Sequence, residues 1–383
     1  MSSSRSAHND PTARVSAQAE ASRSGAWTVR ALLAWMVPYL SEREVDSPRA
    51  VAEILLGSVL GCERLKLYME PERELAPDEL TKLRALVTRA GRHEPVQYLV
   101  GRWPFFGRDF EVGPSTLIPR PCTEVLVEHA LGWMRERKAT QPSASLDVLD
   151  LCTGTGCIAI SLALGLRAIQ RPEGAGCRPL RGGESHDVPR AVNLPVARDI
   201  ARESALENSL ENSLDGQMRA SDAEVVDGAA SSTSKHAPSR KLVATDLVAD
   251  AVELARRNAE RLGATIDLRV GDLYAPLRDD EHFDLIVSNP PYITDAEYEE
   301  LDRNVREYEP ASALKGGADG LQFVRSVVAG AEKRLRAGGL LLVEIGWKHG
   351  EAVRKLGTRA GWRDVDVLRD GDGHERVLVA HRA

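Results

Sequence analysis

The chain has 383 residues, of which 43% are hydrophobic and 28% charged, and these values indicate a soluble globular protein with two or three domains. Its 50 basic and 57 acidic residues give a net charge of -7, which argues against binding mainly through phosphate contacts. The longest apolar stretch, from Ala31 to Leu40, is about half the roughly 20 residues that span a bilayer, so we expect no transmembrane helix. Five scattered cysteines without a Cys-x-x-Cys pair favour a reducing cytoplasm and indicate no disulfide framework and no metal site.

The first part of the chain is polar and then helical in pattern. Residues 1–25 are rich in Ser, Ala and Arg and lack an apolar core, which predicts a disordered tail and not a signal peptide. In residues 26–92 apolar side chains recur at helical spacing, from Leu32 to Tyr39 and again from Val51 to Val59. Pro77-Asp78 is a typical start for a third helix. We therefore predict a small helical domain over residues 26–92.

Residues 93–122 stand apart by their aromatic and glycine content. We predict a β-hairpin followed by a loop that Pro119 and Pro121 stiffen. Five aromatic side chains lie in this linker segment, and they either fill the core or face a substrate. These residues are Tyr98, Trp103, Phe105, Phe106 and Phe110.

Residues 123–383 alternate between predicted strands and helices, which indicates an open, mostly parallel α/β sheet. The predicted strands are 146–151, 241–245, 266–270, 283–287, 340–345, 365–368 and 377–380, and the predicted helices are 157–166, 249–262, 323–335 and 351–360. Residues 168–240 interrupt this alternation and contain no Phe, Tyr or Trp. Such a composition buries too little apolar surface to offset the entropy of ordering, so we predict a disordered insertion. A short helix lined by Leu206, Leu210 and Leu214 is the alternative.

The first chemical signal is a glycine-rich turn at the end of the first of these strands. Gly154 and Gly156 allow a tight turn and the close approach of a ligand, and the next helix offers free N–H groups to an anionic part of that ligand. Ala159 stands where a dinucleotide fingerprint has its last glycine, so a dinucleotide, S-adenosylmethionine or no ligand at all would be compatible with the turn. The candidate cofactor contacts are Cys152, Thr153, Gly154, Thr155 and Gly156.

Two carboxylates follow the next two strands. Asp246 can accept hydrogen bonds from both ribose hydroxyls of a nucleoside. With the insertion left out, it lies about 20 residues beyond Asp150, as that role requires. Asp246 can also cap the helix that follows. Asp272 can accept a hydrogen bond from an adenine amino group while Leu273 packs on the ring, and the alternative for Asp272 is an ordinary loop carboxylate.

The run Asn289-Pro290-Pro291-Tyr292, which we call the tetrad, follows the fourth predicted strand. Its prolines fix φ and restrict the residues before them, so the loop holds its carbonyls and the Asn289 side chain in place. The nitrogen of a planar NH2 group is a poor nucleophile, and it must be oriented by two acceptors to meet a methyl carbon in line. The Asn289 side-chain oxygen and the Pro290 carbonyl can do this while Tyr292 packs on the planar group. We predict a catalytic role for the tetrad, with a plain double-proline turn as the alternative.

The tetrad resembles the signature of amino-methyltransferases that act on planar nitrogens. A wider set of motifs resembles the HemK/PrmC family, whose members methylate the N5 nitrogen of the Gly-Gly-Gln glutamine in bacterial peptide chain release factors. These motifs are His93-Glu94-Pro95-Val96-Gln97-Tyr98-Leu99, Leu117-Ile118-Pro119-Arg120-Pro121, Glu309-Pro310 and Gly316-Gly317-Ala318-Asp319-Gly320-Leu321. The resemblance runs from about Trp27 to the C-terminus, without the insertion.

The resemblance implies a helical domain that docks the protein substrate, a hairpin linker and a seven-stranded, Rossmann-like methyltransferase domain over residues 123–383. It implies S-adenosylmethionine as cofactor, a peptide chain release factor as partner, and a cytoplasmic location with no membrane or nucleic-acid target. It places Cys152 to Gly156, Asp246, Leu273 and Asn289 against the cofactor, and the tetrad around the glutamine. Asp272 joins the cofactor contacts on the reasoning given above.

The sequence departs from the family pattern at three places. Cys152 stands where the family often has glycine, Cys122 stands where an acidic residue is common, and residues 168–240 are not typical. Three rival functions stay open. One is a glutamine methyltransferase of a ribosomal protein, one is a nucleic-acid adenine methyltransferase, which the acidic charge disfavours, and one is a non-catalytic paralogue that binds the translation machinery.

Overall fold

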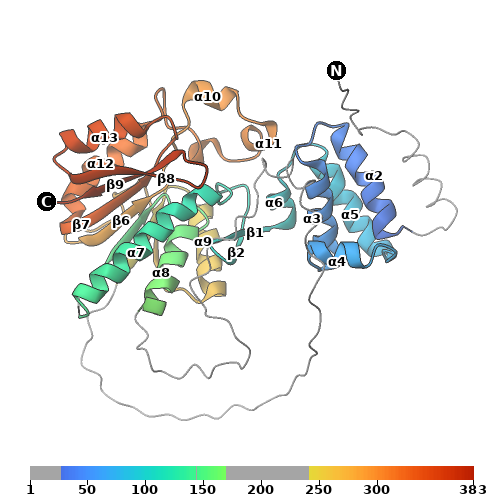
Figure 1. The fold of residues 1–383 in the computed structure, drawn as a ribbon, viewed down its shortest axis with the longest axis horizontal. Coiled ribbons are helices and arrows are strands. Elements are labelled where there is room, and N and C mark those ends of the chain that lie inside the picture. Colours follow the sequence, from blue (N-terminus) through green and yellow to red (C-terminus); the bar gives the residue numbers. More distant parts are fainter. Residues whose placement is uncertain (1–26, 144, 170–240) are drawn as a thin grey trace, which may run out of the picture.

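The computed structural model describes residues 27–143, 145–169 and 241–383. Figure 1 shows a group of helices beside a larger part built on a sheet. The helices are α2 Val29–Ser41, α3 Pro48–Leu60, α4 Arg64–Met69, α5 Pro77–Ala90, α6 Val96–Val100, α7 Glu124–Thr140, α8 Cys157–Ile169, α9 Ala249–Leu262, α10 Asp295–Glu299, α11 Arg303–Arg306, α12 Gln322–Arg334 and α13 Gly350–Arg359. The strands are β1 Arg102–Phe105, β2 Arg108–Glu111, β3 Val148–Leu151, β4 Leu242–Asp246, β5 Asp267–Val270, β6 Phe283–Ser288, β7 Leu335–Glu344, β8 Arg363–Arg369 and β9 Glu375–His381.

The N-terminal helices form where the apolar periodicity predicts them. Helix α3 begins at Pro48 and α5 begins at Pro77, each with proline in the first turn, where its missing N–H costs nothing. Their apolar faces meet in a core of their own that runs from Val29 to Leu99. The short helix α4, which we did not predict, closes this core with the buried Leu67. The boundaries of a separate domain over residues 26–92 stay a prediction.

The linker contains the expected hairpin but starts differently. Strands β1 and β2 pair antiparallel around a turn at Phe106-Gly107, where both residues have positive φ. The preceding segment Val96–Val100 is the one-turn helix α6, which Gly101 ends with φ of 74°. Most of the aromatic side chains fill the core, since Phe105 and Phe110 are fully buried among residues of α7, α8 and the sheet.

The larger part is a seven-stranded sheet in the order β5-β4-β3-β6-β7-β9-β8. The first five strands in this order run parallel, and β9 pairs antiparallel with both β7 and β8. This confirms the predicted open, mostly parallel α/β fold. Residues 1–25 and the predicted insertion from residue 170 to 240 lie outside the described residues. The first two residues of that predicted insertion, 168 and 169, are the last turn of α8.

Helices cover both faces of the sheet, and the strand residues alternate between them. Val148, Leu285 and Leu340 point to the face covered by α7 and α8, whereas their neighbours Leu149, Ile286 and Leu341 point to the face covered by α12 and α13 (Figure 1). Helix α7 was not predicted.

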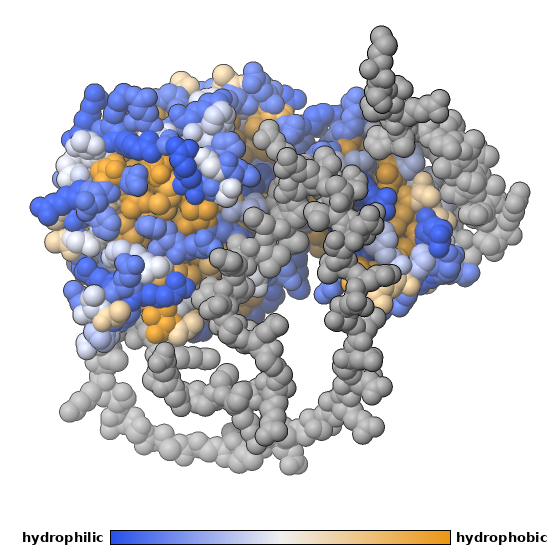
Figure 2. Space-filling view, in the orientation of Figure 1, coloured by the Kyte–Doolittle hydropathy of each residue, from blue (hydrophilic) through white to orange (hydrophobic). Residues whose placement is uncertain are grey.

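Figure 2 shows hydrophilic residues over most of the visible surface of the described part, with apolar patches framed by them. No helix among the described residues is both long and apolar enough to cross a bilayer.

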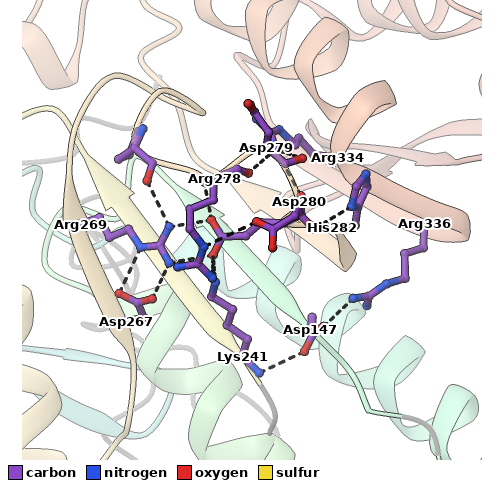
Figure 3. A network of polar contacts seen from close by, with 12 residues as sticks. Asp147, Lys241, Asp267, Arg269, Arg278, Asp279, Asp280, His282, Arg334 and Arg336 are labelled. Carbon is purple, nitrogen blue, oxygen red and sulfur yellow. Dashed lines mark hydrogen bonds and ion pairs between the residues drawn. The ribbon is translucent and has the colours of Figure 1, made fainter. Parts of the chain in front are cut away.

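A network of charges holds the amino-terminal ends of the central strands together (Figure 3). Arg269, Arg278 and Lys241 converge on the buried carboxylate of Glu281, with Arg269 Nη1 2.8 Å and Arg278 Nη2 3.1 Å from it. Beside them Arg336 bridges Asp147 and Asp284, at 2.6 Å from each. Asp147, Lys241 and Asp284 come just before or at the start of β3, β4 and β6, whereas Arg269 lies in β5 and Arg336 at the start of β7. The network therefore ties five neighbouring strands together away from the carboxyl ends of β3, β4 and β6.

The charge cluster around Glu281 predicts a large and measurable contribution to the stability of the fold. Glu281→Ala removes the one acid that three cations share in a buried place, and we expect a loss of about 3 kcal/mol in the free energy of unfolding. The control is Glu72→Ala, because the Glu72 carboxylate pairs with Arg30 on the surface, where both side chains are more than 60% exposed. That control should lose less than about 1 kcal/mol. Urea unfolding measures both, and equal losses would contradict the structural role of the cluster.

Candidate functional site

A cavity of about 370 Å³ lies at the carboxyl ends of β3, β4 and β6, within the usual size range of ligand sites. Strand order reverses between β3 and β6, which is the position where open α/β sheets bind ligands. The predicted site residues that line it are Cys152, Thr153, Gly154, Thr155, Asp246, Asp272, Leu273, Asn289 and Pro291. Gly156, Pro290 and Tyr292 do not line it. The loops after three strands thus bring together most of the residues that the sequence selected.

The glycine-rich turn after β3 has a left-handed backbone at alternate positions. Gly154 and Gly156 have φ of 54° and 78°, and Cys152 adopts 59°, a region that side chains with Cβ rarely occupy. A Cβ on Gly156 would lie 3.1 Å from the Cβ of Ala255, so this glycine lets α8 approach α9. Cys152 therefore replaces the family glycine at the cost of backbone strain, while its side chain lies at the cavity wall.

Asp246 connects two of these loops. Its Oδ2 accepts a hydrogen bond from Gly154 N at 2.9 Å, and its Oδ1 accepts one from Val248 N at 3.0 Å. The residue that caps α9 is Val248, so Asp246 holds the turn before the helix and is not itself the N-cap. Burial raises the pKa of Asp246, and the two backbone donors oppose that rise.

Asp150 lies directly behind the turn and is fully buried. Its Oδ2 accepts a hydrogen bond from Thr153 Oγ1 at 2.6 Å, whereas its Oδ1 is buried without a partner. Burial raises the pKa of Asp150 to about 7, and the nearby Asp246 charge adds to the rise. The acids Asp150, Asp246 and Asp272 all act on the Cys152 thiol, whose pKa is raised by burial and by their negative charges. The turn is therefore an acidic environment suited to a cationic ligand.

The tetrad is held from behind by side chains of other elements. Asn289 Nδ2 donates a hydrogen bond to Thr123 Oγ1 at 3.2 Å, and Tyr292 Oη donates one to Glu344 Oε1 at 3.1 Å. The Tyr292 hydroxyl is thus turned away from the cavity toward a buried acid, and burial raises its pKa well above the ordinary value. Backbone hydrogen bonds between Ile293 and the segment 314–316 join the tetrad to the loop that follows α11.

Sequence reasoning missed Thr123, Glu344 and the opposite wall of the cavity. That wall is formed by residues 115–120 and 311–315, and its two halves are joined because Glu309 Oε2 accepts a hydrogen bond from Ile118 N at 3.0 Å and Glu309 also pairs with Arg120. The signals for Glu309 and Arg120 were the quoted Glu309-Pro310 and Arg120-Pro121 motifs. The Thr123-Glu124 context after Arg120-Pro121 favoured the release-factor branch of the family, but it gave Thr123 no role in the site, and Glu344 belongs to no motif.

A sheet in this order, with β9 antiparallel between β7 and β8, is the fold of the class I S-adenosylmethionine-dependent methyltransferases, and this chain has that fold. Residues 31–101 match the family described as the PrmC N-terminal domain, and residues 227–306 match the Methyltransferase small domain.

Similarity to curated relatives shows to which family of methyltransferases the chain belongs. A release factor glutamine methyltransferase of Geobacter sulfurreducens is 36% identical over 352 residues, which cover 92% of this chain and 96% of the relative. One of Rhodopirellula baltica is 29% identical over 368 residues, which cover 95% and 100%. A solved release factor-specific protein-(glutamine-N5) methyltransferase from Alicyclobacillus acidocaldarius shares 24% identity, covers 71% of this chain and 99% of its own, and has a TM-score of 0.31. The chain belongs to the release factor glutamine methyltransferase family.

The raised pKa of Asp150 predicts a pH effect on stability. The folded chain keeps a proton on Asp150 up to about pH 7, whereas the unfolded chain releases it near pH 4, so this group lowers stability progressively from about pH 4 to about pH 7. Asp150→Asn cannot lose that proton. We expect its stability relative to wild type to be higher at pH 8 than at pH 5, as measured by urea unfolding without ligand. The same difference at both pH values would contradict the raised pKa.

Proposed function

We propose that this protein transfers a methyl group from S-adenosylmethionine to the N5 amide nitrogen of the Gly-Gly-Gln glutamine in peptide chain release factors. The observation that carries the proposal is the placement of Asn289 on the same cavity as Asp246 and the glycine-rich turn. One cavity can then hold a nucleoside methyl donor and a planar amide side by side. The family membership supplies the substrate class. Release factors act in translation, so we propose the cytoplasm as the place of action.

The cavity residues suit S-adenosylmethionine chemically. Asp246 would accept hydrogen bonds from the ribose hydroxyls, Asp272 would accept one from the adenine amino group, and Leu273 would pack on the ring. Cys152, Thr153, Gly154 and Thr155 would lie along the amino-acid portion. The ligand is a cation at its sulfonium, and the carboxylates of Asp246 and Asp272, whose charges reach Cys152, give it a favourable field. The arrangement calls for no metal ion.

The reaction needs position more than acid–base chemistry. S-adenosylmethionine, when bound, supplies a methyl group already activated on a positively charged sulfur. The side-chain oxygen of Asn289, which lines the cavity, would accept a hydrogen bond from an amide hydrogen of the substrate and help to aim its nitrogen at the methyl carbon. A C–N bond forms as the S–C bond breaks, and the surplus proton passes from nitrogen to water. Orientation of this kind lowers barriers by up to roughly 7–11 kcal/mol in favourable cases.

One assay, combined with calorimetry, separates the proposal from two of the rivals, the methyltransferase of a ribosomal protein and the non-catalytic paralogue. Labelled S-adenosylmethionine is offered with purified release factor, with its Gln→Ala variant at the Gly-Gly-Gln site, or with ribosomal protein. Label in the wild-type factor alone supports the proposal. Label in a ribosomal protein alone favours the sister activity. No label in any protein, with no cofactor binding by calorimetry, favours a non-catalytic paralogue.

The tetrad assignment predicts a selective loss of turnover. Asn289→Ala removes an acceptor for the substrate amide but leaves the cofactor side of the cavity in place, so kcat should fall by about 10²-fold or more while the Kd for S-adenosylmethionine changes by less than about fivefold. Turnover with release factor and calorimetry with the cofactor measure the two values. Turnover within a few-fold of wild type would refute the role of the tetrad.

Asp246, on the cofactor side of the cavity, predicts the opposite result, in which cofactor affinity falls more than kcat at saturating cofactor. Asp246→Asn keeps the shape but replaces one acceptor oxygen with an NH2 group, which cannot accept from a ribose hydroxyl and competes with Gly154 N or Val248 N. We expect the Kd for S-adenosylmethionine to rise by about 10- to 100-fold. Calorimetry measures this directly. Saturating cofactor should restore much of kcat, and a Kd equal to that of wild type would remove Asp246 from the site.

A further inference from the structure

The loop of residues 316–320 belongs to a motif that the proposed reaction leaves without a task. It lies directly against the tetrad, and Gly316 N donates a hydrogen bond at 2.8 Å to the carbonyl of Ile293, the residue after the tetrad. A Cβ on Gly316 would lie 2.7 Å from Tyr292 Cα and 2.8 Å from Pro291 O, so a residue with a side chain could not approach this closely. The 316–320 loop therefore forms a wall behind the last two residues of the tetrad.

The imidazole of His349 lies at the same place. A Cβ on Gly320 would lie 2.5 Å from His349 Cε1, and it would also collide with Tyr292 O. A Cβ on Gly346, just beyond β7, would lie 2.9 Å from both Cε1 and Nδ1 of the imidazole and 3.5 Å from Tyr292 Cδ2. The same two glycines thus border both His349 and Tyr292. The imidazole occupies the room that these glycines leave beside Tyr292.

Hydrogen bonding does not explain a histidine at this position. The backbone of His349 donates to Gly346 O at 2.8 Å and accepts from Val353 N at 3.0 Å, which almost any residue could do. The side chain gives α13 no capping hydrogen bond, and its Nδ1 is buried without a partner. The side chain does not line the cavity either. What the imidazole contributes is therefore its volume and shape, directly behind the tetrad.

The tetrad can carry a shift at Tyr292 on to the cavity. Pro290 and Pro291 fix φ, which leaves the backbone between Asn289 and Tyr292 few ways to bend. Asn289 and Pro291 line the cavity, whereas Tyr292 does not. A tetrad that moved into the space left by a missing imidazole would therefore take the Asn289 oxygen away from the substrate amide. A misplacement of about 1 Å can lower a rate by about 10²-fold.

We propose that His349 is a positioning residue, whose imidazole supports the tetrad from behind and so fixes the place of the Asn289 oxygen. This role rests on the methyl transfer proposed above. The imidazole lies outside the cavity lining, and it acts only through Tyr292 and the 316–320 loop.

Two substitutions at this position test the role. His349→Ala removes the imidazole, and His349→Gln replaces it with a planar group of similar volume. We expect His349→Ala to lower kcat by about 10- to 100-fold, with the KM for release factor and the Kd for S-adenosylmethionine within about threefold of wild type. His349→Gln should keep kcat within about fivefold of wild type. Turnover with labelled cofactor and calorimetry measure these values, and urea unfolding shows whether each variant is folded in the assay.

Gly346→Ala tests the same contact from the opposite side. The backbone of Gly346 is not left-handed, so alanine is compatible with it, but the new Cβ would press on the imidazole. We expect kcat to fall by about tenfold. In the double variant His349→Ala/Gly346→Ala the imidazole is absent, so kcat should be within about threefold of His349→Ala alone, whereas independent losses would multiply. Gly132→Ala in α7 is the matched control, since a Cβ there meets nothing within 4 Å, and it should leave kcat unchanged.

The outcomes separate this role from the proposed function. If the wild type labels no release factor, the proposed function fails and the role of His349 falls with it. If the wild type is active and His349→Ala keeps kcat within about twofold of wild type, the positioning role is overturned while the function stands. A His349→Gln variant as slow as His349→Ala, a Kd that worsens in step with kcat, or multiplying losses in the double variant would likewise overturn it. If His349→Ala does not fold, Gly346→Ala decides, and an unchanged kcat in that variant overturns the role.

Discussion

The site depends on one constraint, the parallel pairing of β3 with β4 on one side and β6 on the other. Leu151 lies opposite both Thr245 and Ser288 in this register. The loops after all three strands therefore leave the sheet at the same height and along the same edge. The Gly154–Asp246 hydrogen bond links residues 92 positions apart in sequence across that edge. A shift of one residue in either pairing would turn the strand faces over and separate these groups.

Much of this part could be predicted from the sequence because its signals are local. Buried parallel strands are continuous apolar runs, and polar residues placed directly after them must meet at the edge where the strands end. This logic selected Asp246 and Asn289, which the structure brings to one cavity. It could not select Thr123, because this residue follows no strand and reaches the cavity from the turn before α7, beside Asn289, 166 positions away. Glu344 was hidden as well, because it follows the apolar run Leu340 to Val343 at the end of β7 and belongs to no motif.

The hairpin linker shows where local pattern was insufficient. Val96–Val100 is rich in β-branched and aromatic residues, a composition that favours strands, yet it forms the helical turn α6. Tertiary contacts decide between the two. The turn places Leu99 in the core of the N-terminal helices and directs Tyr98 Oη to Thr116 O at 2.7 Å, so that one short element joins both parts of the chain.

The buried acids at the two ends of the strands differ in whether they have cationic partners. At the amino-terminal edge Glu281 and Asp284 are matched by arginines, so their charges support the fold. At the carboxyl edge Asp150 Oδ1 and Glu344 Oε2 are buried without partners. Buried acids without partners lower the stability of the fold. The ion pairs at the other end of the strands and the apolar cores on both faces of the sheet must offset this loss. Asp150 lies behind the glycine-rich turn and Glu344 behind the tetrad, so the stability that they cost is given up next to the proposed site.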